Sequence, residues 1–129
     1  MEERLPKRKV LIIDDDKGIL FTLKMRLEYF GYHVITANNS AEGIFLAGRE
    51  EPEIVLLDIK MPGSDGTHVF ESINLVSPAS TVIFITAYDE EIMKLENIGK
   101  PCYIMRKPLS APILNEFIKK AIRKQSGDI

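Results

Sequence analysis

Five short apolar runs, each followed by a stretch with helical spacing, constrain what this chain can fold into. The clearest run, Ile54 to Leu57, is bounded by Pro52 and by Pro62–Gly63 and leads directly into Asp58. Four consecutive apolar residues indicate a strand buried on both faces, as in a parallel sheet covered by helices. The alternation of strand and helix therefore predicts an α/β fold with a doubly wound, five-stranded parallel sheet and five helices.

The same patterns give approximate bounds for every element. The predicted strands are 9–13, 32–37, 54–57, 81–86 and 103–105. The predicted helices are 17–30, 40–49, 67–76, 89–98 and 110–122. Gly31 is expected to end the first helix, and Asn39, with Glu42 three residues later, is expected to cap the second.

Composition favours a single soluble domain spanning 1–129, with its core at about 8–124. The 129 residues are 45% apolar with a net charge of −2, which predicts no direct contact with nucleic acid or a membrane surface. The single cysteine, Cys102, favours a reducing compartment, and the first apolar run is too short for a signal peptide. We therefore expect a cytoplasmic location, and no effector domain in residues 125–129.

Polar side chains follow four of the predicted strands. Asp14 and Asp15 come after the first strand, Asp58 after the third, Thr86 ends the fourth and Lys107 follows the fifth. The carboxyl ends of parallel strands meet at one edge of a sheet, where ligands bind. These five side chains are therefore expected to converge, although Asp58 taken alone could merely open a turn.

Such a cluster indicates phosphoryl chemistry with a metal ion. Carboxylates about 5 Å apart repel by roughly 3 kcal/mol per pair at an effective dielectric constant near 20, so the cluster needs a cation. Oxygen ligands without His or Cys favour Mg²⁺. Lys107 and Thr86 could hold phosphoryl oxygens while an Asp carboxylate attacks phosphorus. The alternative is a structural ion-pair network between Lys107 and the acids.

The motifs, in this order, resemble those of the receiver domains of two-component response regulators. The resemblance covers residues 8–124 and rests on Asp14-Asp15-Asp16, on Leu57-Asp58-Ile59-Lys60-Met61-Pro62-Gly63 with Asp65-Gly66, on Ile85-Thr86-Ala87 and on Arg106-Lys107-Pro108. It implies a flavodoxin-like fold with strand order 2-1-3-4-5. It also implies a signalling switch rather than a turnover enzyme.

The resemblance assigns a role to each site residue. Asp58 would accept a phosphoryl group from a sensor histidine kinase or a phosphotransfer protein. Asp15, Asp58 and the backbone carbonyl of Lys60 would ligate Mg²⁺ directly, with Asp14 acting mostly through water. Thr86 would turn toward the phosphoryl group and Lys107 would pair with it, next to a cis Lys107–Pro108 peptide.

The output implied by the resemblance passes through the surface of helix four, strand five and helix five. It would reach a downstream effector protein or an effector domain absent from this chain, and homodimerisation could accompany activation. In similar domains an aromatic residue lies three positions before the lysine, but here that residue is Ile104, and Tyr103 lies one position away. Lys60 and Tyr88 are expected to flank the site and tune hydrolysis of the acyl phosphate.

Two other functions fit parts of the sequence. The segment Asp14 to Leu20 faintly resembles the nucleophile loop of haloacid-dehalogenase-type phosphatases, but these enzymes need an acidic pair after their lysine. The only acidic residues after Lys107 in this sequence are Glu116 and Asp128. The second alternative, a non-phosphorylated receiver used only as an interaction module, would typically lack an acid or the lysine.

Overall fold

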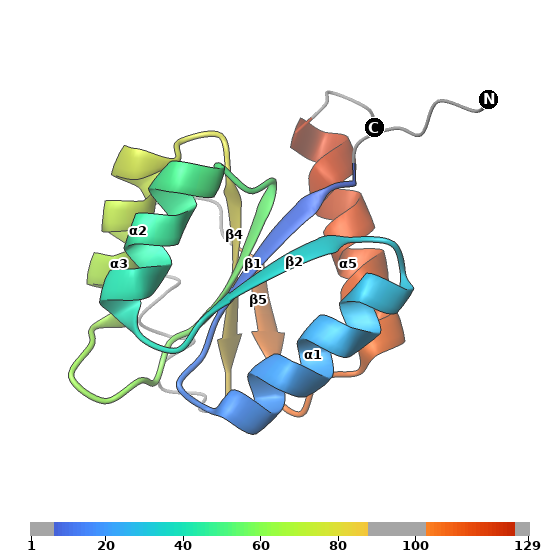
Figure 1. The fold of residues 1–129 in the computed structure, drawn as a ribbon, viewed down its shortest axis with the longest axis horizontal. Helices are drawn as coiled ribbons and strands as arrows, with labels where there is room; N and C mark the ends of the chain where they lie inside the picture. The colour runs from blue at the N-terminus through green and yellow to red at the C-terminus, as the bar shows by residue number, and fades with distance from the viewer. Residues whose placement is uncertain (1–6, 88–102, 126–129) are drawn as a thin grey trace.

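The sheet and its helices follow the predicted order. A computed structural model describes residues 7–87 and 103–125, in which five parallel strands form one sheet in the order β2-β1-β3-β4-β5 (Figure 1). The strands are β1 (Lys9–Ile13), β2 (His33–Ala37), β3 (Ile54–Asp58), β4 (Thr81–Thr86) and β5 (Tyr103–Arg106). The described helices are α1 (Lys17–Tyr29), α2 (Ser40–Glu50), α3 (Gly66–Val76) and α5 (Ala111–Gln125). The helix expected at 89–98 lies outside the described residues.

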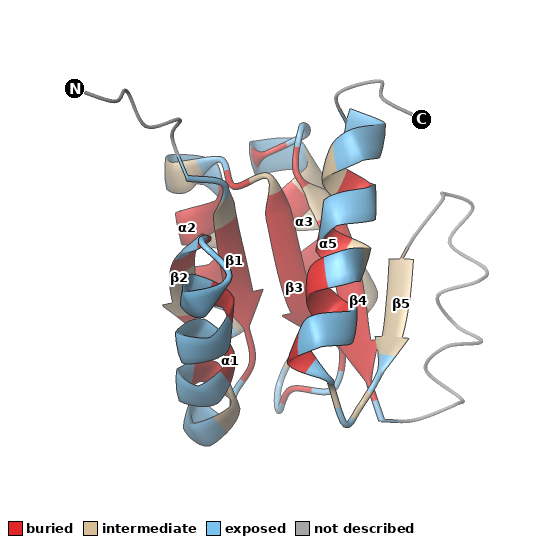
Figure 2. Cartoon of the chain, turned by 90° about the vertical axis from the view of Figure 1, so that its right-hand side faces the viewer, coloured by how far each residue is buried: buried red, intermediate tan, exposed pale blue. Residues whose placement is uncertain are grey.

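Helices cover both faces of the sheet. In Figure 1, α1 and α5 lie on one face and α2 and α3 on the other. Alternate residues of the strands feed two separate apolar cores, one under each helix pair. The central strands β1, β3 and β4 are almost entirely buried, whereas β5 is half-buried (Figure 2). This explains why the central strands read as continuous apolar runs.

Three helices begin at an amide or carboxylate cap. The side chain of Asp16 accepts hydrogen bonds from the backbone N–H groups of the first turn of α1, Asn39 does the same for α2, and Asp65 for α3. At the end of α1, Gly31 adopts φ +100°, a conformation that glycine takes without strain. The expected cap at Asn39 and stop at Gly31 are both confirmed.

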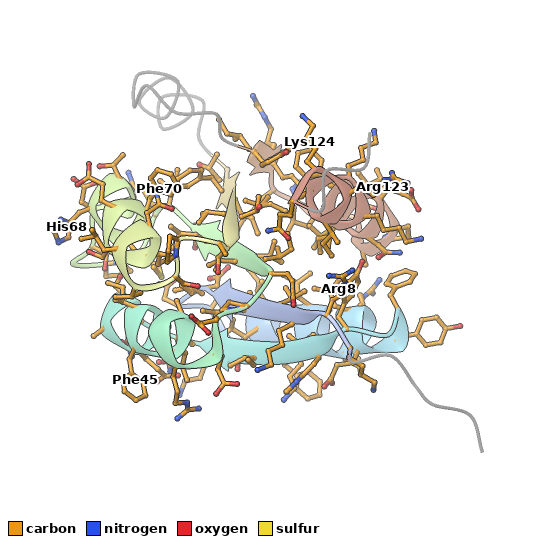
Figure 3. The ribbon with its side chains drawn as sticks, turned by 90° about the horizontal axis from the view of Figure 1, so that it is seen from above. Arg8, Phe45, His68, Phe70, Arg123 and Lys124 are labelled. Atoms are coloured by element: carbon orange, nitrogen blue, oxygen red, sulfur yellow. The ribbon has the colours of Figure 1, made fainter. Side chains whose placement is uncertain are left out.

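The α2 and α3 layer has an apolar inner side. Phe70 points from α3 toward the sheet and contacts the ring of Phe84 with centroids 5.1 Å apart, whereas Phe45 points from α2 into solvent (Figure 3). Gly66 begins α3 so close to the backbone of Ile59 that a Cβ atom would lie only 3.2 Å from the Cα atom of Ile59. This close approach fixes the loop that follows Asp58. No described helix is long and apolar enough to cross a membrane.

All five strands point the same way, so the sheet has two chemically different edges. We call the edge where the strands end the C-terminal edge and the edge where they begin the N-terminal edge. β1, β3, β4 and β5 deliver their last residues to the C-terminal edge in neighbouring positions. The predicted site residues lie at the ends of these four strands or directly after them.

Candidate functional site

Three consecutive aspartates after β1 have three different environments. Asp14 is buried, and its Oδ1 accepts a hydrogen bond from the backbone N–H of Asp16 at 2.9 Å. Asp15 is exposed beside it. Asp16 caps α1 through bonds of 2.9 and 3.1 Å to the N–H groups of Gly18 and Ile19. This cap was not predicted from the sequence, although an Asp before a helix is its usual signal.

Asp58 is the last residue of β3 and is also buried. It lies opposite Ile85 of the neighbouring strand β4, and its Oδ1 accepts a hydrogen bond from the backbone N–H of Lys60 at 3.1 Å. The next residue, Ile59, donates its N–H to the carbonyl of Ile85 at 3.1 Å. The backbone on both sides of Asp58 is thus held while its other carboxylate oxygen faces the cluster.

Lys107 bridges the two buried acids. Its Nζ lies 3.2 Å from Oδ2 of Asp14 and 3.3 Å from Oδ2 of Asp58, although these residues are 93 and 49 positions away in the chain. The Lys107–Pro108 peptide is cis, as expected. Thr86, fully buried at the end of β4, accepts the backbone N–H of Lys107 at 2.8 Å through its carbonyl oxygen. The structure thus brings Asp14, Asp15, Asp58 and Lys107 together and places Thr86 at the same edge.

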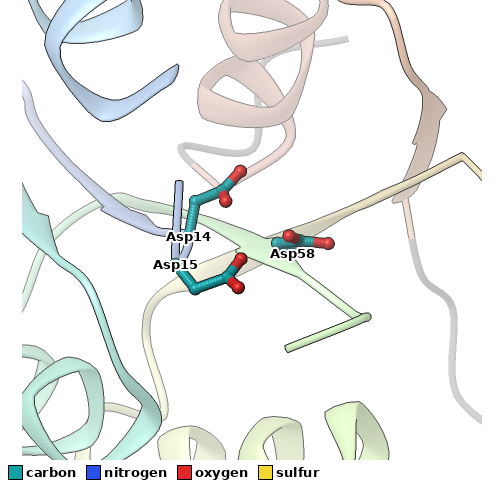
Figure 4. Close-up of side chains that lie close together, drawn as sticks. All are labelled: Asp14, Asp15 and Asp58. Carbon is teal, nitrogen blue, oxygen red and sulfur yellow. The ribbon is translucent and has the colours of Figure 1, made fainter. Parts of the chain in front are cut away.

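Among the described residues of the cluster, three carboxylates lie beside one bridging ammonium group. Carboxylate oxygens of Asp14, Asp15 and Asp58 lie within 4.8 Å of one another (Figure 4), and in the described part of the chain the ammonium group of Lys107 contacts two of these carboxylates. Burial, and then the charge of Asp14, raise the pKa of Asp58 from 3.8 to about 6, although Lys107 and the Lys60 N–H oppose this. Burial alone would lower the pKa of Lys107, but the carboxylates of Asp58 and Asp14 together raise it.

The donor atoms of the cluster suit a small, hard cation. Octahedral Mg²⁺ binds oxygen ligands at about 2.1 Å, which places ligand oxygens roughly 3–4 Å apart. Oxygens already within 4.8 Å of one another need only a small inward movement to reach this spacing. The exposed side of the cluster at Asp15 leaves room for the water ligands that Mg²⁺ usually keeps. The residues therefore fit Mg²⁺ in number and in chemistry.

Tyr103 and Ile104, near the position where similar domains carry an aromatic residue, lie in different surroundings. Ile104 packs against the core under α2 and α3, whereas Tyr103 packs on the α5 side, with its ring 5.4 Å from that of Phe117. Tyr103 and Ile104 therefore lie on opposite faces of the sheet, as neighbours in a strand do. Tyr88 lies outside the described residues, and the ligand role of the Lys60 carbonyl stays a prediction.

A hollow beside the cluster was not predicted from the sequence. It has a volume of about 700 Å³ and lies between the start of α1, at Asp16 and Ile19, and the loop after β5, at Lys107 and Leu109. Its walls come from segments about 90 residues apart, so no local pattern could have indicated it. Lys107, whose ammonium group contacts Asp14 and Asp58, is one of the residues that line the hollow.

Comparisons with known sequences agree with the site. The model of the response regulator receiver domain family matches residues 10–123. The alkaline phosphatase synthesis transcriptional regulatory protein PhoP of Bacillus subtilis is 33% identical over 91% of this chain and 49% of its own length. The probable transcriptional regulator ycf27 of Porphyra purpurea is 36% identical over 92% of this chain and 49% of its own length. The chain thus spans about half the length of these curated relatives.

Solved structures give the same result for the whole fold. A CheY-like response regulator receiver domain protein from Methanospirillum hungatei superposes with a TM-score of 0.85 and 33% identity, covering 95% of this chain and 98% of the other. A receiver domain protein from Clostridium thermocellum superposes with a TM-score of 0.83 and 30% identity, covering 92% and 97%.

Proposed function

Because this chain belongs to the response regulator receiver domain family of two-component systems, we propose that Asp58 is the residue that accepts its phosphoryl group. The observation that carries the proposal is the pair of contacts from Lys107 to Asp58 and Asp14, at 3.3 and 3.2 Å. A half-buried lysine that faces two buried carboxylates is well placed to neutralise a phosphoryl group attached to one of them. The family match argues against the haloacid-dehalogenase alternative.

The proposed reaction is a displacement at phosphorus. An oxygen of Asp58 forms a bond to the phosphorus atom of a phosphohistidine on a partner protein, the bond from phosphorus to the imidazole nitrogen breaks, and the electron pair stays on that nitrogen. The product is an acyl phosphate. Lys107 holds one phosphoryl oxygen by its charge, and the Thr86 hydroxyl donates to another. The chain accelerates the transfer by position and charge.

Receiver domains generally bind Mg²⁺ at an acidic pocket. In this chain we propose Asp15, Asp58 and the Lys60 carbonyl as its ligands, with Asp14 acting through water. When bound, the ion neutralises negative charge on the carboxylates and on the incoming phosphoryl group. The burial of Asp14 and Asp58, and the backbone bonds that hold them, keep these two carboxylates oriented before the ion arrives.

We propose the phosphoryl donor and the effector of this protein by class only. The phosphoryl donor is a sensor histidine kinase or a phosphotransfer protein, and the hollow beside Lys107 is a route by which it can reach Asp58. The relatives are named as transcriptional regulators, and a DNA-binding or other effector part is a proposal for this protein. The signal leaves through the surface that includes β5 and α5, since Lys107 follows β5 directly. The cytoplasmic location expected from the sequence stays a prediction.

Intact-mass spectrometry with acetyl phosphate and MgCl₂ tests the phosphoacceptor. We expect a gain of one phosphoryl group that hydroxylamine removes, because an acyl phosphate is labile to this nucleophile. Asp58→Asn should abolish the gain. Asp65→Asn, the same substitution on an exposed aspartate that caps α3, should leave it intact. Labelling of Asp58→Asn, or a hydroxylamine-resistant label, would assign the phosphoryl group to another residue.

A further inference from the structure

Helix α1 is apolar on two opposite sides. Three leucines face the sheet and are buried, namely Leu20, Leu23 and Leu27. On the other side Phe21, Met25 and Tyr29 are spaced four residues apart and are 69%, 56% and 87% exposed. We call these three residues the α1 stripe. Figure 2 shows the outer side of α1 as exposed. The outer side of a surface helix is normally polar, so the α1 stripe needs an explanation.

The α1 stripe is large enough to take part in an interface. An aromatic side chain presents roughly 150–250 Å² of surface, so the stripe exposes on the order of 400 Å². Exposed patches of this size on a monomer often mark an interaction site. A shallow hollow lined by Met25, Tyr29 and Phe30 of the α1 end, with Ala111 and Pro112 of α5, adjoins the stripe and enlarges the apolar surface.

Charges beside the α1 stripe suggest what covers it. With 3.6 residues per turn, Lys24 and Glu28 lie on the same flank of Met25, about 100° and 60° around the helix from it. Both side chains are exposed, and neither forms an ion pair with a described residue. The opposite flank carries Thr22 and Arg26, with no acid.

This flank is self-complementary when two α1 helices run antiparallel. A two-fold axis at Met25 brings the same flank of both helices together. With a rise of 1.5 Å per residue, Lys24 of one copy then lies about 3 Å along the axis from Glu28 of the other, and the symmetric pair forms as well. A parallel arrangement would instead place Lys24 against the flank that carries Arg26, a like charge.

We propose that the α1 stripe is the interface of a homodimer in which a second copy of this chain packs antiparallel on α1. Met25 contacts its own copy at the two-fold axis, and Phe21 packs beside Tyr29 of the partner subunit. Two Lys24–Glu28 pairs flank these contacts and fix the direction of pairing. The interface is centred on α1 and separate from β5, and it does not depend on phosphorylation of Asp58.

Sedimentation equilibrium across micromolar to millimolar concentrations tests the dimer. We expect Met25→Lys to make the protein monomeric, because it places two ammonium groups at the two-fold axis. Leu75→Lys is the matched control, since Leu75 is an exposed apolar residue on α3 and its variant should dimerise like the wild type. Circular dichroism spectra of both variants establish that they are folded.

Charge reversal tests the direction of pairing. Lys24→Glu and Glu28→Lys should each weaken dimerisation roughly tenfold, because each variant places two like-charged pairs across the interface. An equimolar mixture of the two variants should dimerise again, since each mixed pair then joins opposite charges. Effects within a single helix cannot produce this rescue by mixing.

Other outcomes would overturn the proposal. A wild type that stays monomeric at millimolar concentration would exclude the homodimer. A dimer that survives Met25→Lys uses another surface. Charge-reversal variants that fail to rescue each other would exclude the antiparallel arrangement. Loss of vesicle binding or of phosphotransfer from a kinase in Met25→Lys, with no dimer in the wild type, would assign the stripe to a membrane or to the donor protein.

Discussion

The two edges of the sheet treat buried polar groups in opposite ways. At the N-terminal edge, the hydroxyls of Ser77 and Ser80 are 2.6 Å apart, and that of Ser80 also donates to the carbonyl of Pro52. The side-chain amide of Gln125 donates to the carbonyl of Glu53 and to the hydroxyl of Thr81, each at 2.6 Å. These groups are neutral and paired, and they join loops to the end of α5.

At the C-terminal edge the polar groups are charged, and their charges do not cancel. Among the described residues, two buried carboxylates share the ammonium group of Lys107, and the exposed carboxylate of Asp15 lies beside them. Such an arrangement costs stability unless a cation completes it. The difference indicates that the N-terminal edge stabilises the fold, whereas the C-terminal edge retains a charge that a ligand can neutralise. Substitutions at the two edges should therefore change stability in opposite directions.

The largest effect is expected at Asp58. Its pKa is raised from 3.8 in the unfolded chain to about 6 in the fold, so the folded state binds a proton more tightly. The associated stability is fully present below pH 3.8 and is lost as the pH rises through about 6. A difference of this size corresponds to at most about 3 kcal/mol at 1.4 kcal/mol per pKa unit. Metal-free Asp58→Asn should therefore unfold with a higher free energy than wild type at pH 7.

Urea denaturation of wild type and Asp58→Asn between pH 3.5 and 7, with EDTA, measures this difference. Asp65→Asn is the control of opposite sign. The hydrogen bonds from the side chain and then the backbone of Thr67 lower the pKa of Asp65, so Asp65 stabilises the fold at neutral pH and loses this contribution in acid. Asp58→Asn that is no more stable than wild type at pH 7 would mean that Lys107 already balances the cluster.

The second effect is expected at Ser80, at the opposite edge. Ser80→Ala removes the partner of both the buried Ser77 hydroxyl and the Pro52 carbonyl, which should cost about 1–3 kcal/mol of unfolding free energy. The double variant Ser77→Ala/Ser80→Ala should cost less than the sum of the two single variants, because the hydroxyl that Ser80→Ala leaves unpaired is then absent. Additive losses in urea denaturation would show that the two hydroxyls do not depend on each other.

Much of the fold could be predicted because its strongest signals are local. A strand buried on both faces is continuously apolar, so the sequence predicts β1, β3 and β4 from their apolar runs. The polar residues at the ends of these runs indicate the candidate site. The cluster followed because parallel strands deliver their ends to one edge. The position of Lys107 between Asp14 and Asp58 confirms this reasoning with residues 49 to 93 positions apart.

What could not be predicted depends on contacts between distant segments. Asn115 lies on the buried side of α5 because its Oδ1 accepts the hydroxyl of Tyr32, 83 residues earlier, and no local pattern gives that pairing. Ile113 is an apolar residue of α5 next to the buried Leu114, yet it is 62% exposed. Periodicity shows which residues share a side of a helix, but the neighbouring segments decide how much of that side is covered.

The third effect is stabilisation by Mg²⁺, which is expected to bind at the C-terminal edge and not at the N-terminal edge. Mg²⁺ at ten times its dissociation constant should raise the unfolding free energy of wild type by ~1.4 kcal/mol, because the ion binds only the folded site. Ser80→Ala should gain the same amount, since its altered edge lies far from the ligands. Thermal denaturation with increasing MgCl₂ measures both gains, with CaCl₂ as a comparison of ion size. An equal gain in Asp58→Asn would place the ion elsewhere.

The smallest effect is expected at Gln125. The hydrogen bonds that its side-chain amide donates are exposed to solvent. Gln125→Ala should therefore lower the free energy of unfolding by about 0.5–1.5 kcal/mol and should loosen the last turn of α5. Gln125→Glu keeps the length of the side chain but removes its donor, so a similar loss would assign the effect to hydrogen bonding. Lys120→Ala, an exposed substitution on the same helix, should be nearly neutral.

The Gln125 variants also test whether the two edges are independent. Hydrogen exchange of the α5 amides and phosphoryl labelling are measured on the same samples. We expect faster exchange in the last turn of α5 and unchanged labelling of Asp58, because the amide of Gln125 joins groups at the N-terminal edge only. Reduced labelling in Gln125→Ala would mean that α5 transmits changes between the edges. Stability and phosphoryl acceptance would then be coupled through α5 rather than divided between the two ends of the sheet.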